Sequence, residues 1–127
     1  MAARRRPATM RVIAGSARGA RLRGPGDQRT RPTAARLRES LFSMLESARA
    51  DLSQVLDLYA GSGALGIEAL SRGGGHCTFV EADAAACRLI RENLRRTRMA
   101  AQGTVIRARV GRWRPPAVNY SKTPIRP

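Results

Sequence analysis

Apolar residues recur at two different spacings along this chain. In residues 34–49 they come every three or four positions, which predicts an amphipathic helix. Its core-facing stripe is expected to consist of Leu37, Leu41, Met44, Leu45 and Ala48. Short apolar runs then alternate with helix-like stretches, which predicts parallel βαβ units with helices covering both faces of the sheet. The strands are expected at 54–59, 77–80 and 104–109, and the helices at 64–72 and 84–97.

Residues 11–14 and 20–23 are short strand-like pieces around a segment with a glycine at each end, and they predict a β-hairpin. Thr33 is the expected N-cap of the helix that follows. The pattern divides the chain into four regions. These are a disordered basic arm (1–9), a hairpin with a helix (10–50), a cofactor-binding βαβ region (51–110) and an irregular proline-rich tail (111–127).

A glycine turn joins the first predicted strand to the next helix. Gly61, Gly63 and Gly66 form the pattern G-x-G-x-x-G, and Glu81 follows Gly61 by twenty residues, at the end of the next apolar run. This layout is typical of a nucleotide-cofactor site in which the acid binds ribose hydroxyls. Gly61 is expected to permit the turn, Gly63 to leave room for the ligand, and Gly66 to let helix and strand pack closely.

Asp57, inside the first strand, indicates which type of cofactor the site binds. A carboxylate at the end of this strand repels a phosphate and attracts an ammonium group. S-adenosylmethionine carries an ammonium group and a ribose but no phosphate, so Asp57 and Glu81 together favour it over a dinucleotide. Two alternatives stay open: a nicotinamide or flavin site, and a glycine turn that only packs a βα unit.

The net charge of the chain indicates what kind of partner it binds. Its 127 residues, enough for one domain, include 23 Arg and one Lys against nine acids, a net charge of +15. Twelve of the arginines lie in the first 49 residues with only three acids. A genome rich in G and C explains part of the arginine total but not this concentration. The excess therefore favours a nucleic acid as partner.

Other features exclude some classes of protein. No apolar stretch approaches the roughly 20 residues of a membrane span, so we expect a cytoplasmic protein without a membrane partner. Cys77 and Cys87 lack nearby histidines and are expected to be small buried hydrophobes. We therefore expect neither a metal site nor a disulfide.

Seven motifs occur in order over residues 10–110. They are Arg11-Val-Ile-Ala-Gly15, Gly19-Ala-Arg-Leu22, Thr30-Arg-Pro-Thr33, Arg36-Leu-Arg-Glu-Ser-Leu-Phe42, Leu56-Asp-Leu-Tyr-Ala-Gly-Ser-Gly-Ala-Leu-Gly66, Glu68-Ala-Leu-Ser-Arg-Gly73 and Val80-Glu-Ala-Asp83. Together they resemble the bacterial RsmD family. That resemblance implies a Rossmann-like class I methyltransferase fold, S-adenosylmethionine as cofactor, and methylation of a guanine N2 in small-subunit ribosomal RNA, free or within an assembly intermediate.

The resemblance and the spacing together suggest two groups of site residues. Those expected at the cofactor are Asp57, Tyr59, Gly61, Gly63, Glu81 and Asp83. Those expected at the RNA are Arg18, Arg21, Arg31, Thr33, Arg36 and Arg38.

The sequence departs from the family at two places. Arg109 stands where an acid is expected to contact the adenine, and Arg114-Pro-Pro-Ala117 has only the prolines of the catalytic (Asn/Asp)-Pro-Pro-aromatic motif. We therefore assign no catalytic residue. We expect an incomplete sheet of about three strands and a truncated or frame-shifted end after residue 110. The alternative function is that of a basic RNA-binding fragment without catalysis.

Overall fold

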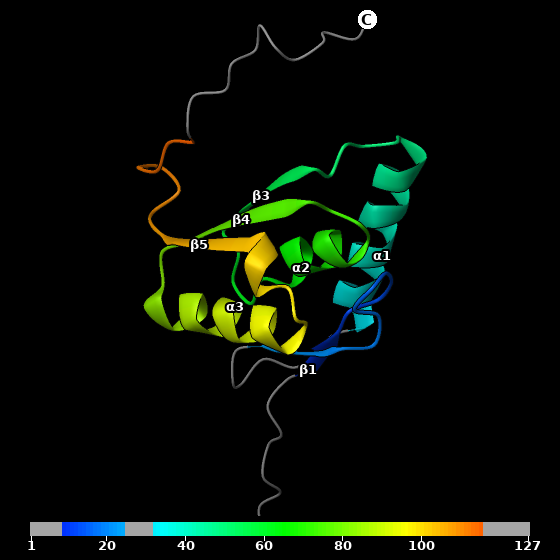
Figure 1. The fold of residues 1–127 in the computed structure, drawn as a ribbon, viewed down its shortest axis with the longest axis horizontal. Helices are drawn as coiled ribbons and strands as arrows, with labels where there is room; N and C mark the ends of the chain where they lie inside the picture. Colours follow the sequence, from blue (N-terminus) through cyan, green and yellow to red (C-terminus); the bar gives the residue numbers. More distant parts are fainter. Residues whose placement is uncertain (1–8, 25–31, 116–127) are drawn as a thin grey trace, which may run out of the picture.

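The computed structural model describes residues 9–24 and 32–115 (Figure 1). The expected arm, up to residue 8, and the tail from residue 116 onward lie outside the described residues. The elements are β1 (Thr9–Arg11), β2 (Arg21–Arg23), α1 (Pro32–Ser47), β3 (Gln54–Leu58), α2 (Ala64–Ser71), β4 (His76–Glu81), α3 (Ala84–Arg96), a 3₁₀ turn (Ala100–Gln102) and β5 (Gly103–Arg107). For most of the expected strands and helices, the two ends lie within two residues of the predicted positions.

A three-stranded parallel sheet forms the centre of the fold, in the order β3-β4-β5. Helices α2 and α3 both lie on one face of it, because Cys77 and Phe79, alternate residues of β4, point toward them. Phe79 is fully buried among side chains of both helices, including Ile67 and Ile90. This confirms the predicted α/β class.

The close approach of α2 to the sheet depends on Gly66. A Cβ built on this residue would lie 2.4 Å from the Phe79 ring and 2.6 Å from the Cys77 sulfur. Neither neighbour can retreat, since both are fully buried in the sheet. The expectation that Gly66 permits close helix–strand packing is therefore confirmed.

The opposite face of the sheet is less covered than the sequence suggests. Leu56 and Leu58 point away from α2 and α3, and each keeps more than 40% of its surface exposed. Within the described residues β3 also pairs on one side only, with β4. The expectation that helices cover both faces of the sheet is wrong for this part of the chain.

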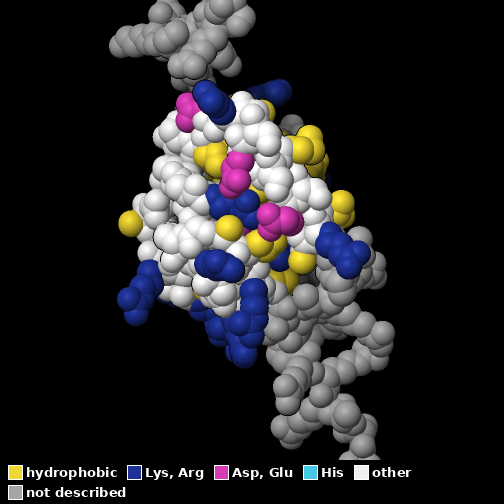
Figure 2. Space-filling view, turned by 90° about the vertical axis from the view of Figure 1, so that its right-hand side faces the viewer, with side chains coloured by type: hydrophobic (Ala, Val, Ile, Leu, Met, Phe, Trp, Pro, Cys, Tyr) yellow, Lys and Arg dark blue, Asp and Glu magenta, His cyan; other side chains and the backbone are white. Residues whose placement is uncertain are grey.

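Helix α1 packs with a different face from the one its apolar stripe predicts. Leu37 and Met44 are 66% and 68% exposed, whereas Arg38 and Phe42 are buried. The physical reason is that Arg38 reaches the buried Glu68 and Phe42 lies beneath Arg72. Figure 2, which faces the α1 side of the molecule, shows hydrophobic side chains at the surface. The contacts with Glu68 and Arg72, and not the apolar stripe, therefore orient α1.

The hairpin is shorter than expected, and α1 begins earlier. Strands β1 and β2 pair antiparallel with Met10 opposite Leu22, and regular pairing stops before residues 13 and 14 because their N–H groups bond to Glu68. Helix α1 starts at Pro32, so Thr33 lies in its first turn and is not the N-cap. Proline suits the first helical position because its missing N–H would have no helical partner there.

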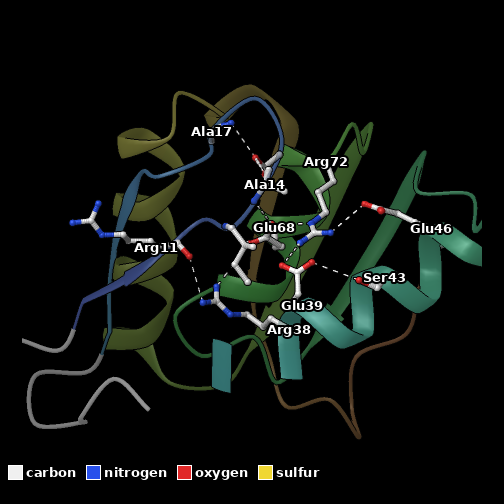
Figure 3. Close-up of polar contacts among 11 residues, drawn as sticks. Arg11, Ala14, Ala17, Arg38, Glu39, Ser43, Glu46, Glu68 and Arg72 are labelled. Atoms are coloured by element: carbon white, nitrogen blue, oxygen red, sulfur yellow. Dashed lines mark hydrogen bonds and ion pairs between the residues drawn. The ribbon is translucent and has the colours of Figure 1, made fainter. Parts of the chain in front are cut away.

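Glu68 holds the hairpin and α1 against α2 (Figure 3). Its carboxylate is fully buried and accepts hydrogen bonds from the N–H groups of Ile13 (2.8 Å) and Ala14 (3.1 Å). Arg72 donates to the same carboxylate at 2.9 Å, and the Arg38 guanidinium lies 3.9 Å away. One side chain thus connects the hairpin loop, α1 and α2.

Ser71 provides a second connection, one helical turn further along α2. Its hydroxyl donates to the Ala14 carbonyl (2.6 Å) and accepts the N–H of Ala17 (2.9 Å). Its own carbonyl accepts the N–H of Ser16 at 2.7 Å. The loop passes so close that a Cβ on Gly15 would lie 1.8 Å from the Ser71 carbonyl oxygen, so only glycine fits there.

The contact of Gly66 with Phe79 predicts the effect of a single methyl group. Gly66→Ala should lower the free energy of unfolding by about 1–3 kcal/mol, because the methyl group overpacks a rigid part of the core. Gly111→Ala is the matched control, since no atom lies within 4 Å of its Cβ position. Urea unfolding of both variants measures the difference. Equal stabilities would contradict this account of the packing.

Burial of Glu68 predicts a large effect of removing its charge. Glu68→Gln should cost about 3–5 kcal/mol in urea unfolding, because it leaves the buried Arg38 without a counter-charge. Glu39→Gln serves as the control: Glu39 also pairs with Arg72, at 3.5 Å, but its side chain is half exposed. That variant should lose less than about 1 kcal/mol. Similar losses in the two variants would show that Glu68 is not the anchor.

Candidate cofactor site at the carboxyl ends of β3 and β4

The glycine turn follows β3 directly. Gly61 and Gly63 have φ angles of +59° and +82°, which are left-handed conformations that favour glycine. Tyr59 also has a positive φ of +56° and is 77% exposed. A left-handed tyrosine is uncommon and costs free energy, so the surrounding turn must hold it in place. It therefore presents an aromatic ring at the surface beside the turn.

Glu81 lies at the end of β4 and is bound to the turn. The Gly61 N–H donates to its Oε1 at 3.0 Å, and the Asp83 N–H donates to its Oε2 at 2.7 Å. The carboxylate is only partly buried. Because a carboxylate has about four acceptor positions, Glu81 can accept further hydrogen bonds from a ligand. The sequence separation of twenty residues thus becomes a direct contact.

Asp57 is buried beneath the turn. Its Oδ2 accepts the N–H of Gly66 at 3.1 Å, in the first turn of α2. The N-cap residue, Gly63, has no side chain to accept such a bond, so Asp57 supplies the capping carboxylate from β3. Burial raises the pKa of Asp57 to about 6, against the lowering effect of the Gly66 hydrogen bond. An adjacent cation would favour its ionised form.

Gly61 and Gly63 have different surroundings. The Cβ direction of Gly61 is open, with only the Tyr59 carbonyl oxygen as near as 4.0 Å. A Cβ on Gly63 would instead meet Ile90 of α3 at 3.2 Å, so α3 occupies that side of the residue. The expected role of Gly63 at the cofactor stays a prediction.

Asn93 is a buried residue of the site that the sequence did not reveal. Its side-chain amide donates to the carbonyl oxygens of Ser62, inside the glycine turn, and Arg23, each at 2.9 Å. Its Oδ1 accepts the Arg23 N–H at 2.8 Å. Asn93 therefore joins β2 of the hairpin to the glycine turn. The only signal in the sequence was a polar residue among the inward positions of α3.

Asp83 has an evident local role. It is the N-cap of α3, as expected, and its Oδ2 accepts the Ala86 N–H at 2.8 Å. Its side chain is exposed at the end of β4, two residues beyond Glu81, and its cofactor role stays a prediction.

The residues expected at the RNA fall into different environments. Arg18 and Arg21 are exposed on the hairpin, and Arg36 is exposed on α1. Arg38 is buried, donates to the Arg11 carbonyl at 3.3 Å and faces Glu68, so it does not present a free guanidinium to a phosphate. Burial is also the main cause that lowers its pKa. Arg31 lies outside the described residues.

Both cysteines are buried free thiols, as expected. Burial raises the pKa of Cys77 to about 12, with the Asp57 charge as a second cause. Within residues 9–24 and 32–115, no group of three or more His, Cys, Asp or Glu side chains is arranged to hold a metal ion. Over the same residues, no helix combines the length and apolarity that a bilayer span requires.

A solved structure supports the class of protein that this fold defines. The chain superposes on an Escherichia coli structure entitled "Putative methyltransferase yhhF" with a TM-score of 0.67 and 42% identity, over 80% of this chain and 54% of that one. The parallel sheet, glycine turn and acid at the end of the second strand are those of the Rossmann-like class I methyltransferase fold.

The family follows from the sequence comparison. The model described as Conserved hypothetical protein 95 matches residues 10–120, and the chain belongs to this family, the RsmD family. It is 44% identical to "Putative rRNA methyltransferase YlbH" of Bacillus subtilis, over 77% of this chain and 53% of the relative. It is 45% identical to "Ribosomal RNA small subunit methyltransferase D" of Escherichia coli K12, over 67% of this chain and 42% of that relative. The chain spans about half the length of these curated relatives.

The raised pKa of Asp57 predicts a pH dependence of stability. Between about pH 4 and 6 the unfolded chain loses the Asp57 proton while the folded chain keeps it, so stability contributed by the protonated group falls as pH rises. Relative to Asp57→Asn, the wild type should lose up to about 3 kcal/mol across this window. Urea unfolding at several pH values measures the difference. A difference that stays flat or grows with pH would contradict the assignment.

Proposed function

We propose that this chain binds S-adenosylmethionine at the carboxyl ends of β3 and β4, as the cofactor half of an enzyme that methylates a guanine N2 in small-subunit ribosomal RNA. The observation that carries the proposal is the hydrogen bond from Gly61 to Glu81, which fixes a carboxylate against a glycine turn. The names of the two curated relatives support ribosomal RNA as the substrate.

The residues of the site fit this cofactor. Glu81 uses two acceptor positions within the protein and has about two more for the two ribose hydroxyls. Gly61 offers open space beside the turn. The exposed Tyr59 and Asp83 border the same turn and strand end, and both are proposed as cofactor contacts.

Asp57 supports an ammonium-bearing cofactor over a phosphate-bearing one. Its pKa of about 6 leaves the carboxylate mostly ionised at neutral pH. Its negative charge then repels a phosphate and attracts an ammonium group. Bound S-adenosylmethionine supplies an activated methyl group. The role of this chain's residues is to hold and orient the cofactor.

The transfer step needs groups that this sequence does not contain. A guanine exocyclic amine is a poor nucleophile, because its lone pair is delocalised into the ring, and it must be oriented by hydrogen-bond acceptors and by stacking of the base. Arg114-Pro-Pro-Ala117 lacks both the Asn or Asp and the aromatic residue that would do this. We therefore propose cofactor binding as the activity of these residues and assign no catalytic side chain.

The hairpin is the proposed RNA-facing element. Arg18 and Arg21 are exposed on it, and Arg36 of α1 is exposed as well. These cations carry no ion pair within the described residues and are available to phosphates. The same observation supports the second candidate function, a basic RNA-binding fragment without catalysis.

Calorimetric titration with S-adenosylmethionine tests the proposal. The folded chain should bind it, and Glu81→Ala should weaken binding by roughly 10- to 100-fold through loss of charge-assisted hydrogen bonds to the ribose. Glu92→Ala, which removes a partly exposed acid on α3, is the control and should bind as the wild type does. NADH should not compete.

Two results would count against the proposal. A folded wild type that gives no heat with S-adenosylmethionine would favour the RNA-binding fragment. Equal affinities of Glu81→Ala and Glu92→Ala would show that Glu81 does not contact the cofactor. Circular dichroism of each variant checks that the fold is retained, because Glu81 also accepts the Gly61 N–H.

A further inference from the structure

We propose that the outer face of α3 is a second RNA-binding surface, which contacts backbone phosphates beyond those reached by the hairpin. The inference rests on ribosomal RNA as the proposed partner. Its main residues are Arg88, Arg91 and Arg95, here called the α3 arginine row, and all three are exposed. Separations of three and four residues place them on one stripe of the helix, with neighbours about 5–6 Å apart.

No acid within the described residues forms an ion pair with the row. Glu92 is the only acid of α3, and it is occupied by Arg23 (3.3 Å) and Arg96 (3.4 Å). Like charges three or four residues apart destabilise a helix, so the row has a cost in the free chain. A polyanion bound along the helix would remove that cost.

The fold itself does not require these arginines. The face of α3 that packs on the sheet carries Cys87, Ile90 and Leu94, each one position before an arginine of the row and so about 100° around the helix from it. Cations favour the last turn of a helix because of its dipole, which accounts for Arg95. The dipole does not account for Arg88 or Arg91, which lie outside the last turn of the helix.

Arg107 of β5, an edge strand within the described part of the chain, extends the basic surface. It is exposed, and its Nε donates to the Ala82 carbonyl at 3.4 Å. Burial raises the pKa of the Cys87 thiol; the charges of Arg91 and Arg107 oppose that rise, and those of Glu81 and Asp83 add to it. Arg107 thus adds one cation to the row, beside the two acids at the carboxyl end of β4.

The position of α3 suits a long RNA ligand. Asn93 binds Arg23 of β2, so the second half of the helix lies beside the hairpin, and its first residues follow Glu81 and Asp83 at the proposed cofactor site (Figure 1). The row covers about 10 Å along this direction, from Arg95 to Arg88. An RNA held at the hairpin can thus continue along α3.

The test uses a triple variant, Arg88→Gln with Arg91→Gln and Arg95→Gln. The probe is a fragment of small-subunit ribosomal RNA, and its affinity is measured at several salt concentrations between about 50 and 300 mM. If each arginine contacts one phosphate, the slope of log K against log salt should fall by about 2–3. Affinity at about 100 mM salt should fall at least roughly tenfold.

The matched control removes the same charge elsewhere, with Arg49→Gln, Arg112→Gln and Arg114→Gln, all at exposed positions outside α3. Its salt slope should change by less than about 1. Equal slopes for the row variant and this control would overturn the proposal, as would a wild type that does not bind the RNA.

S-adenosylmethionine titration of the same proteins separates this inference from the proposed function. A row variant that keeps cofactor binding but has a reduced salt slope supports both. A wild type without cofactor binding, whose RNA slope still depends on the row, supports the RNA surface and refutes the cofactor function. If the row variant keeps both the salt slope and cofactor binding, the RNA-binding surface on α3 is refuted and the proposed cofactor function is not.

Discussion

Burial of the Glu68 carboxylate is the interaction on which the arrangement of this chain depends. An ionised group in the interior costs several kcal/mol unless charged and hydrogen-bonding partners surround it. Glu68 has two backbone N–H groups and Arg72 as partners, with Arg38 at 3.9 Å. Because these partners come from the hairpin loop, α1 and α2, satisfying one carboxylate fixes three parts of the chain relative to one another.

The same requirement explains why α1 turns its apolar stripe outward. The helix is oriented by the need of Arg38 to reach Glu68, and Phe42 follows it inward under the Arg72 guanidinium. Leu37 and Met44 are left at the surface as a consequence. The buried ion pair decides the orientation of α1, because leaving a buried charge unpaired costs more free energy than leaving a leucine side chain exposed to water.

The sequence predicted those features that depend on local pattern. Periodicity located the helices and strands. The twenty-residue spacing placed Glu81 in one site with the glycine turn but did not predict its hydrogen bond from Gly61. It failed where a residue's role depends on a partner distant in sequence. Glu68 and Asn93 are polar residues at inward helix positions, and their partners in the hairpin lie 54 to 70 residues away. Periodicity also does not tell which element a helix face will meet, so the exposed stripe of α1 and the α3 contact of Gly63 were both missed.

The free edge of β3 has a consequence for the colloidal behaviour of the chain. Within the described residues this strand leaves one row of backbone N–H and C=O groups unpaired, beside the exposed Leu56 and Leu58, and such an edge is a template for another strand. A net charge of +15 keeps copies apart at low ionic strength. Added salt shortens the range of that repulsion to about 10 Å at 0.1 M. Added salt therefore lets one copy approach the edge of β3 that is open within the described part of another copy.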